Sequence, residues 1–228
     1  PIEGTKYSVV RQYYDGNGNV IKTAQKKSTD EWNVTVNTYD NMNRPETTQT
    51  GSGGITQYGY DKAGNMTKMA VGLSAPIDIT KANINGDYEL TTYSYDFKNS
   101  LVKATDAMGY EETYKTDMFG NVTSKTDRNG NIIKTTYNPF GKVLTQKVTK
   151  TDGTSETITN TYDILGNIKS MTDSTGTTKY EYDALNRLTN ESKGSIMKLY
   201  TYDAGNNRKT FTLKNGNETI MDTSYELS

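Results

Sequence analysis

The chain has 228 residues, and its 26 Lys and Arg against 27 Asp and Glu give a net charge of −1. The absence of His and Cys excludes Ser-His-Asp and Cys-His catalysis, disulfides, and the usual ligand sets of zinc and iron–sulfur sites. The balanced charge gives no electrostatic case for nucleic-acid binding, and no segment reaches the roughly 18 apolar residues of a membrane span.

The composition favours strands and turns over a large aliphatic core. Leu, Ile, Val and Phe together make 37 of 228 residues, about 16%, which is low for a globular domain. The 18 Tyr and 37 Thr favour strands, whereas the 22 Asn and 20 Gly favour turns. We therefore expect many short strands joined by tight turns.

A seven-residue motif recurs along the chain. It opens with Tyr-Asp, has Gly or Asn at its fifth position and usually ends on an apolar residue. Nine copies begin at residues 14, 39, 60, 95, 116, 137, 162, 182 and 202, with spacings of 20 to 25 residues and one of 35. Two copies are degenerate, because Thr116 replaces the Tyr and Asn138 replaces the Asp.

The motif residues are predicted to be structural. The Asp side chain can accept hydrogen bonds from backbone N–H groups further along the turn, and Gly or Asn at the fifth position tolerates positive φ. The Tyr ring can pack on a strand face against the Tyr of the next copy, and its hydroxyl can find a polar partner. The residues to which we assign these roles are Tyr14, Asp15, Gly18, Tyr39, Asp40, Tyr60, Asp61, Gly64, Tyr95, Asp96, Asp117, Gly120, Tyr137, Gly141, Tyr162, Asp163, Gly166, Tyr182, Asp183, Tyr202 and Asp203.

Segments between the copies add further turns. Longer hairpins are expected around residues 25–32 and 150–156, and the spacing of 35 places an insertion at about residues 70–90. Second turn signals stand at Asp106, Asp127, Asp152 and Asp173. Each repeat is thus predicted to hold two strands and two turns, which makes an antiparallel meander over residues 1–228 as one array.

These Tyr-Asp-x-x-Gly copies and the alternate Asp-x-x-Gly turns resemble the YD repeats of the RHS family of bacterial proteins. Shell subunits of insecticidal toxin complexes, wall-associated bacterial proteins and animal teneurins share such repeats. The resemblance covers about residues 13–211. It implies an all-β strip of tandem hairpins that spirals into a hollow shell around a C-terminal toxin domain.

The same resemblance implies a biological setting. The chain would be a structural scaffold segment of a longer secreted or cell-surface bacterial protein, with the toxin domain of the same parent chain as its partner. Toxin-bearing members close the shell with a self-cleaving Asp-Pro-x-Gly-Leu segment. None of the four Pro residues follows an Asp, so no autoprotease residue is assigned to this chain.

Three alternatives deserve comparison with the structural interpretation. A calcium loop beginning at Asp15 would need Gly and Glu where Val20 and Lys26 stand. Paired carboxylates could hydrolyse glycosides, but a single turn role explains every repeated Asp. An adhesion module that binds carbohydrate or protein could use the Tyr rings and Trp32 for stacking.

We predict no enzymatic activity, no catalytic residue, no cofactor and no metal. Trp32 is the weak candidate for a ligand contact, to a cell-surface glycan or a protein. Nucleic acid and membrane insertion are excluded as partners, and the open edges of the strip predict self-association.

Overall fold

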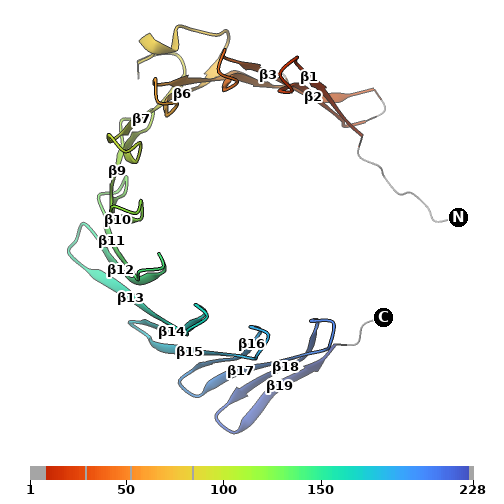
Figure 1. Ribbon diagram of the computed structural model, residues 1–228, viewed down its shortest axis with the longest axis vertical. Coiled ribbons are helices and arrows are strands. Elements are labelled where there is room, and N and C mark those ends of the chain that lie inside the picture. Colours follow the sequence, from red (N-terminus) through yellow and green to blue (C-terminus); the bar gives the residue numbers. More distant parts are fainter. Residues whose placement is uncertain (1–8, 29, 52, 84, 226–228) are drawn as a thin grey trace, which may run out of the picture. The chain divides into compact units, whose positions relative to one another are not determined.

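The computed structural model describes residues 9–28, 30–51, 53–83 and 85–225. Within these residues the chain forms 19 β-strands and one short 3-10 helix, and every strand pairing given is antiparallel between neighbours in sequence (Figure 1). This confirms the predicted all-β fold of tandem hairpins. The single array predicted over residues 1–228 includes residues 1–8 and 226–228, which lie outside the described part.

The chain divides into two compact units, residues 1–114 and 115–228. The strands of the first unit are β1 (Val10–Tyr14), β2 (Val20–Lys26), β3 (Trp32–Tyr39), β4 (Pro45–Thr50), β5 (Ile55–Tyr60), β6 (Met66–Leu73), β7 (Glu89–Tyr95) and β8 (Leu101–Thr105). β9 (Glu111–Thr116) lies at the boundary. In the described part of the chain, no helix has the length and apolarity needed to cross a membrane.

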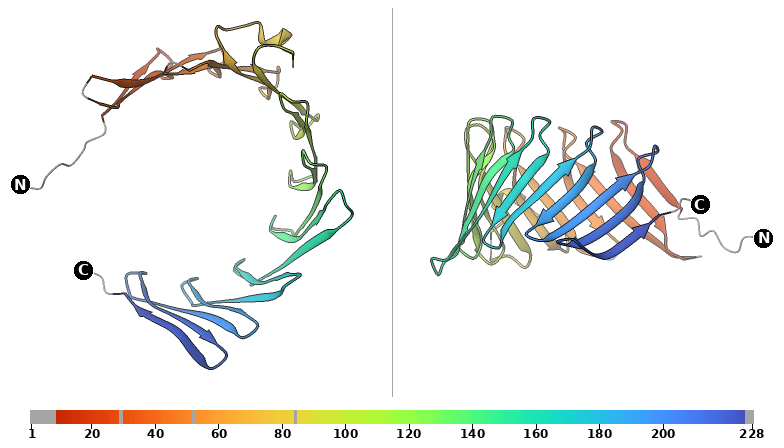
Figure 2. Two further views of the ribbon diagram at one scale, coloured as in Figure 1. Left: turned by 180° about the vertical axis from the view of Figure 1, so that it is seen from behind. Right: turned by 90° about the horizontal axis from the view of Figure 1, so that it is seen from below.

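The second unit continues the meander. Its strands are β10 (Val122–Thr126), β11 (Ile132–Tyr137), β12 (Val143–Thr149), β13 (Ser155–Tyr162), β14 (Ile168–Asp173), β15 (Gly176–Tyr182), β16 (Leu188–Lys193), β17 (Ile196–Tyr202), β18 (Arg208–Asn215) and β19 (Glu218–Ser224). Figure 2 shows its hairpins lying side by side, with turns alternating between two edges of the sheet. We call the edge that carries the Tyr-Asp motifs the motif edge, and the other the opposite edge.

Every motif copy forms the same tight hairpin turn. In the first copy, the Asp15 N–H donates to the Asn19 carbonyl at 3.0 Å and the Gly18 N–H donates to the Asp15 carbonyl at 3.2 Å. Gly18 has φ of +87°, and the strand register shifts at Tyr14, which pairs with Val20. This is a type I turn followed by a left-handed residue and a bulge.

The fifth motif position has positive φ in all nine copies. Gly occupies it five times with φ between 75° and 92°, and Asn occupies it four times with φ between 59° and 67°. The Asn positions are Asn43, Asn99, Asn186 and Asn206. Gly and Asn are the residues that reach this conformation at least cost, so the backbone explains the choice.

The insertion supplies the hydrophobic core of the first unit. β6 ends at Leu73 and β7 begins at Glu89, so the segment predicted at about residues 70–90 is a connection of residues 74–88 that contains the 3-10 helix η1 (Ile79–Lys81). Leu73, Ala70, Ala82 and Leu90 form a buried cluster under this connection. The connection thus packs on β5, β6 and β7.

Polar contacts pin the connection to the sheet. The Gln57 side-chain amide donates to the Ile77 carbonyl and its oxygen accepts from the Ile77 N–H, both at 2.9 Å. The Lys68 Nζ donates to the carbonyls of Thr80 and Ala82 at 2.8 and 3.0 Å. These bonds fix how the connection lies on the sheet.

Elsewhere, hydroxyl pairs link neighbouring strands. In four copies the residue before the motif Tyr is a Thr that faces a Thr or Ser across the hairpin, and the two hydroxyls lie 2.6 to 2.8 Å apart. The pairs are Thr38 with Thr47, Thr136 with Thr145, Thr161 with Ser170, and Thr201 with Thr210. Such cross-strand pairs stabilise a sheet that buries few aliphatic side chains.

Two glycines of one turn provide a test of this geometry. Ala in place of Gly18 would carry the strained φ of +87° although its Cβ meets no atom within 4 Å, whereas Gly16 is equally open and lacks positive φ. We expect Gly18→Ala to lower the free energy of unfolding by about 1 kcal/mol, because only backbone strain is added. Gly16→Ala serves as the control and should be neutral or slightly stabilising. Equal effects in urea denaturation would contradict this account.

Candidate functional site

The Asp side chain organises each motif turn. Asp15 Oδ1 accepts hydrogen bonds from the N–H groups of Asn17 at 2.9 Å and Asn19 at 2.8 Å. In the degenerate copy, the amide oxygen of Asn138 accepts the equivalent bonds from Phe140 and Lys142 at 2.9 and 3.0 Å. One side-chain oxygen is enough for this role, so Asn can replace Asp without changing the turn.

In seven copies, the side chain at the sixth motif position donates a hydrogen bond to Oδ2 of the motif Asp. Where it is Asn, its side-chain amide donates to Oδ2 of the motif Asp, as Asn167 does to Asp163 at 2.9 Å. Where it is Arg, Nε makes the same bond, as Arg187 does to Asp183 at 2.7 Å. The sequence analysis missed this position, although Asn or Arg fills it in seven of the nine copies.

These donors stabilise the ionised carboxylates. Hydrogen bonds from the residue at the sixth position, with those from the turn N–H groups, lower the pKa of Asp15, Asp61, Asp117 and Asp163. At the end of β14, bonds from Thr175 and Lys193 lower the pKa of Asp173 to about 2. The carboxylates therefore hold their turns as anions and have little basicity left for proton transfer.

Tyr hydroxyls connect successive copies. Seven motif tyrosines in the described part donate to the carbonyl of the seventh residue of the preceding copy, at distances of 2.7 to 3.1 Å. The bonds run from Tyr39 to Val20, Tyr60 to Pro45, Tyr95 to Met66, Tyr137 to Val122, Tyr162 to Val143, Tyr182 to Ile168, and Tyr202 to Leu188. We call this recurring bond the tyrosine clamp.

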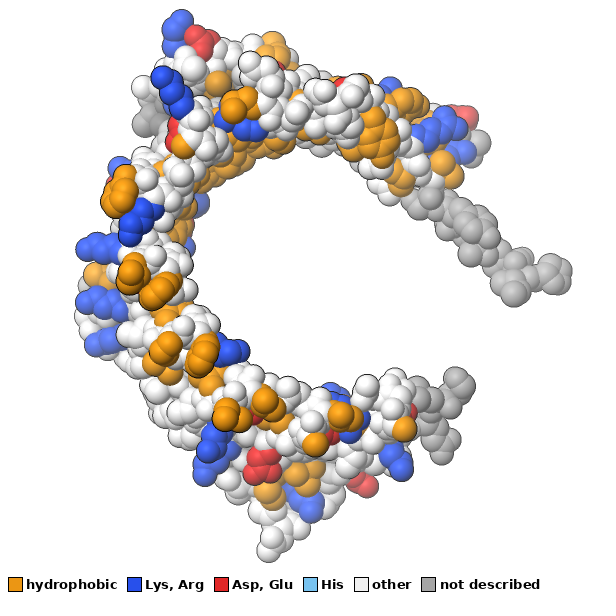
Figure 3. Space-filling model, in the orientation of Figure 1, with side chains coloured by type: hydrophobic (Ala, Val, Ile, Leu, Met, Phe, Trp, Pro, Cys, Tyr) orange, Lys and Arg blue, Asp and Glu red, His pale blue; other side chains and the backbone are white. Residues whose placement is uncertain are grey.

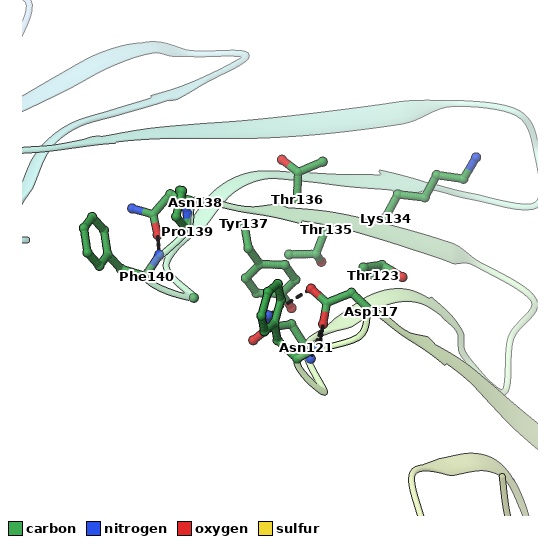
Figure 4. Close-up of a pocket in the computed structure, with 12 residues that line it drawn as sticks. Asp117, Asn121, Thr123, Lys134, Thr135, Thr136, Tyr137, Asn138, Pro139 and Phe140 are labelled. Atoms are coloured by element: carbon green, nitrogen blue, oxygen red, sulfur yellow. Dashed lines mark hydrogen bonds between the residues drawn. The ribbon is translucent and has the colours of Figure 1, made fainter. Parts of the chain in front are cut away.

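Burial accompanies the clamp. The loss of solvent around the ring raises the pKa of Tyr60, Tyr95 and Tyr182, which keeps the hydroxyl protonated as a donor. Figure 4 shows Tyr137 beside the preceding turn, which holds Asp117 and Asn121. The first motif tyrosine, Tyr14, bonds instead to Gln12 Oε1 in its own strand at 3.0 Å.

Arginine at the sixth position adds a second link between copies. Arg187 forms an ion pair with Asp183 at 2.7 Å, donates to the Asp203 carbonyl at 3.2 Å and lies 4.7 Å above the ring of Tyr202. Arg44 repeats this arrangement in the first unit, 4.4 Å above the ring of Tyr60. The expected packing partner of a motif Tyr was the Tyr of the next copy, and these two rings pack against a guanidinium instead.

Trp32 lies apart from the motifs, at the start of β3. The guanidinium of Arg11 is 4.7 Å from its ring centre. Trp32 also lines a shallow cavity of about 480 Å³ with Lys27, Glu31 and Asn33. The ring thus has a packing role within the protein, and its contact with a ligand stays a prediction.

The arrangement is suited to holding hairpins in register. Each motif Asp is bonded within its own turn, and among the described residues no group of three or more His, Cys, Asp or Glu side chains could hold a metal ion. The contacts that recur are the turn bonds, the tyrosine clamp and the links from the sixth position. They define a class of protein, the tandem β-hairpin repeat scaffold.

Comparison with known proteins finds a family model that matches part of the chain. Residues 117–155 and 162–195 match the family model described as RHS Repeat. Together with the repeat geometry, this match supports repeats of the RHS/YD type in these two segments. No curated protein matches its sequence.

Solved structures share the fold. The chain matches the crystal structure of TcdB2-TccC3-Cdc42 with a TM-score of 0.58 and 15% identity, over 95% of this chain and 15% of that one. It matches TcdB2-TccC3 without the hypervariable C-terminal region with a TM-score of 0.59 and 14% identity, over 95% and 14%. The chain therefore spans about one seventh of the length of these structures, and the likeness concerns the fold.

Removing one hydroxyl tests the tyrosine clamp. Tyr162 donates to the Val143 carbonyl at 2.7 Å, so Tyr162→Phe deletes the bond and keeps the ring. We expect the free energy of unfolding to fall by about 1 kcal/mol in urea denaturation. Tyr14→Phe is the matched control and should have little effect, because that hydroxyl bonds only to an exposed side chain of its own strand. A Tyr162→Phe protein as stable as the wild type would contradict the clamp.

The carboxylates predict acid sensitivity. Their pKa values are lowered in the folded state, so their stabilisation is complete above the unfolded Asp pKa of about 3.9 and is lost as pH falls toward the folded values, such as about 2 for Asp173. We expect the melting temperature to be nearly constant from pH 8 to 5, because the chain has no His, and to fall below about pH 4.

A single variant assigns this effect to the turns. Asp163→Asn should keep the turn, as Asn138 does, and should weaken the acid dependence because one titrating group is removed. Melting followed by circular dichroism across pH 8 to 2 measures both proteins. An identical loss of stability in the two would show that Asp163 does not contribute.

Proposed function

We propose that this chain is a scaffold segment of a secreted or cell-surface bacterial RHS-repeat protein, and that it helps to form a β-shell around a C-terminal toxin domain of its parent chain. The tyrosine clamp carries the proposal. Seven copies bond to the copy before them through a main-chain carbonyl, so the sheet can be lengthened by adding copies without a second covering layer. A shell wall needs this property.

The similar structures support this proposal. One of them is TcdB2-TccC3 without its hypervariable C-terminal region, so that assembly has a C-terminal part that varies. By analogy, we infer that repeats like these enclose a C-terminal segment in the parent of this chain. Because the chain spans about 15% of such a structure, a closed shell would need further repeats from the parent.

Protease protection of the parent protein tests encapsulation. We expect the segment that follows the repeats to resist trypsin in the intact parent and to be cleaved rapidly when it is expressed alone, because a closed wall excludes the protease. The matched control is the parent in mild denaturant, where protection should be lost together with the β-sheet signal. Equal cleavage rates for the segment in the native parent and alone would contradict a shell.

The alternative function is adhesion through a glycan or protein. Trp32 is its best candidate contact, and the Arg11 guanidinium beside the ring occupies space that a stacked sugar would need. A glycan array probed with the wild-type chain and with Trp32→Ala separates the two functions. Reproducible binding that Trp32→Ala abolishes would favour adhesion over the shell.

A further inference from the structure

The motif turns of the second unit expose large apolar side chains at their tips. These are Met118, Phe119, Phe140, Ile164, Leu165 and Leu185, which are 67 to 100% exposed. We call these six side chains the tip ridge. They stand at the third and fourth motif positions, where the turn needs no particular residue, as Gly16 and Asn17 of the first copy illustrate. Folding of the turn therefore does not explain them.

The opposite edge of the same unit is polar. Its turns contain Arg128 and Asn129, Thr151 and Asp152, Ser174 and Thr175, Gly194 and Ser195, and Gly216 and Asn217. Both edges are built from tight turns (Figure 2), and the opposite-edge turns at Asp127 and Lys150 have the same backbone hydrogen-bond pattern as the motif turns. The difference in apolar character thus points to a contact made by the motif edge alone.

Grooves separate the apolar tips. The first groove, of about 870 Å³, lies between the turns that hold Phe119 and Phe140 (Figure 4). A second of about 570 Å³ runs from Phe140 to Ile164 and Leu165, and a third of about 520 Å³ extends from these two residues to Asn186. Because adjacent grooves share lining residues, knobs and hollows alternate without a break. Figure 3 shows hydrophobic groups recurring along this unit.

The spacing and area of the tip ridge suit another ridge of the same kind. Successive motif turns are two strands apart, about 10 Å, whereas side chains on one face of an extended strand repeat about every 7 Å. The six side chains expose on the order of 900 Å², close to the 800 Å² that each partner of a stable complex buries. Monomeric proteins rarely leave apolar patches of this size uncovered.

The charged residues that line the grooves allow two identical tip ridges to pack together. Each groove is lined by both signs, with Asp117 and Lys134 in the first, and Lys142 and Asp163 in the second. The motif carboxylates are already bonded inside their turns, so they leave no uncompensated negative row. Two identical ridges therefore bring together no large surface of one sign.

We propose that the tip ridge is a dimerisation surface that takes the tip ridge of a second copy of this chain, with the tips of one copy seated in the grooves of the other. A symmetric interface of this kind uses one patch twice and closes at two copies. It is independent of the open strand edges, which the sequence analysis named as the route to self-association.

Sedimentation of the full chain tests this surface. The triple variant Phe140→Ser, Ile164→Ser, Leu165→Ser should raise the dimer dissociation constant at least about tenfold, because three large apolar side chains are lost from the interface. A control variant, Asn129→Ser with Thr151→Ser, alters the opposite edge and should dimerise like the wild type. A strand-edge variant, Ile220→Lys with Met221→Lys, should also leave the dimer intact if the ridge holds it.

Several results would overturn the proposal. They are a wild-type chain that is monomeric at high concentration, a triple variant that dimerises as tightly as the wild type, and a dimer abolished by the strand-edge variant alone. Monomeric wild type would mean that a different partner covers the ridge.

Thiol labelling provides a second measurement that does not depend on the triple variant. The chain has no Cys, so Ile164→Cys introduces one thiol, and its labelling rate should fall as protein concentration rises. Thr151→Cys on the opposite edge should react at a constant rate. Concentration-independent labelling of Ile164→Cys would contradict burial of the ridge.

Discussion

The bond between a motif tyrosine hydroxyl and a main-chain carbonyl of the preceding copy is the contact on which the repeat architecture depends. An isolated hairpin is marginal in water, and this sheet buries few aliphatic side chains outside the cluster around Leu90. A tyrosine side chain compensates for both, because its ring covers part of the sheet and its hydroxyl donates a hydrogen bond to a carbonyl of the preceding copy. Tyr162 reaches the Val143 carbonyl across a separation of 19 residues, so the bond joins copies and not only neighbouring residues. Repetition of this bond lets the fold extend with a composition poor in Leu, Ile, Val and Phe.

In most motif turns, the two oxygens of the Asp carboxylate accept hydrogen bonds from different donors. One oxygen accepts hydrogen bonds from the N–H groups of the turn. The other accepts a hydrogen bond from the side chain at the sixth motif position, which can also contact the next turn. Arg187 makes all of these contacts: it pairs with Asp183 in its own turn, and it contacts the Asp203 carbonyl and the Tyr202 ring of the next copy. Because the carboxylates are committed to these bonds, a repeated Asp in this chain is better explained by geometry than by acid–base chemistry. These repeats therefore use for structure a residue type that elsewhere serves catalysis.

The two edges and the insertion show where the chain departs from pure repetition. The connection of residues 74–88 packs on β5, β6 and β7 over a buried cluster, held by Gln57 and Lys68. In the second unit, apolar tips appear on the motif edge and polar residues on the opposite edge, although both edges make tight turns. Neither feature is required by the hairpins themselves. Such departures are the places where a repeat protein can acquire partners of its own.

The amino-acid sequence by itself determined the period, the strands and the turns, because these depend on residues close together in the chain. The Tyr-Asp pairs mark strand ends, and Gly or Asn at the fifth position marks a left-handed backbone that few other residues adopt. The partners of the side chains depended on the tertiary structure. The bonds of the tyrosine clamp, the Arg187 contacts with the next turn, and the Arg11 contact with Trp32 join residues 14 to 29 positions apart. Only the register of paired strands brings such residues together, and a one-residue slip would reverse the face on which each side chain lies.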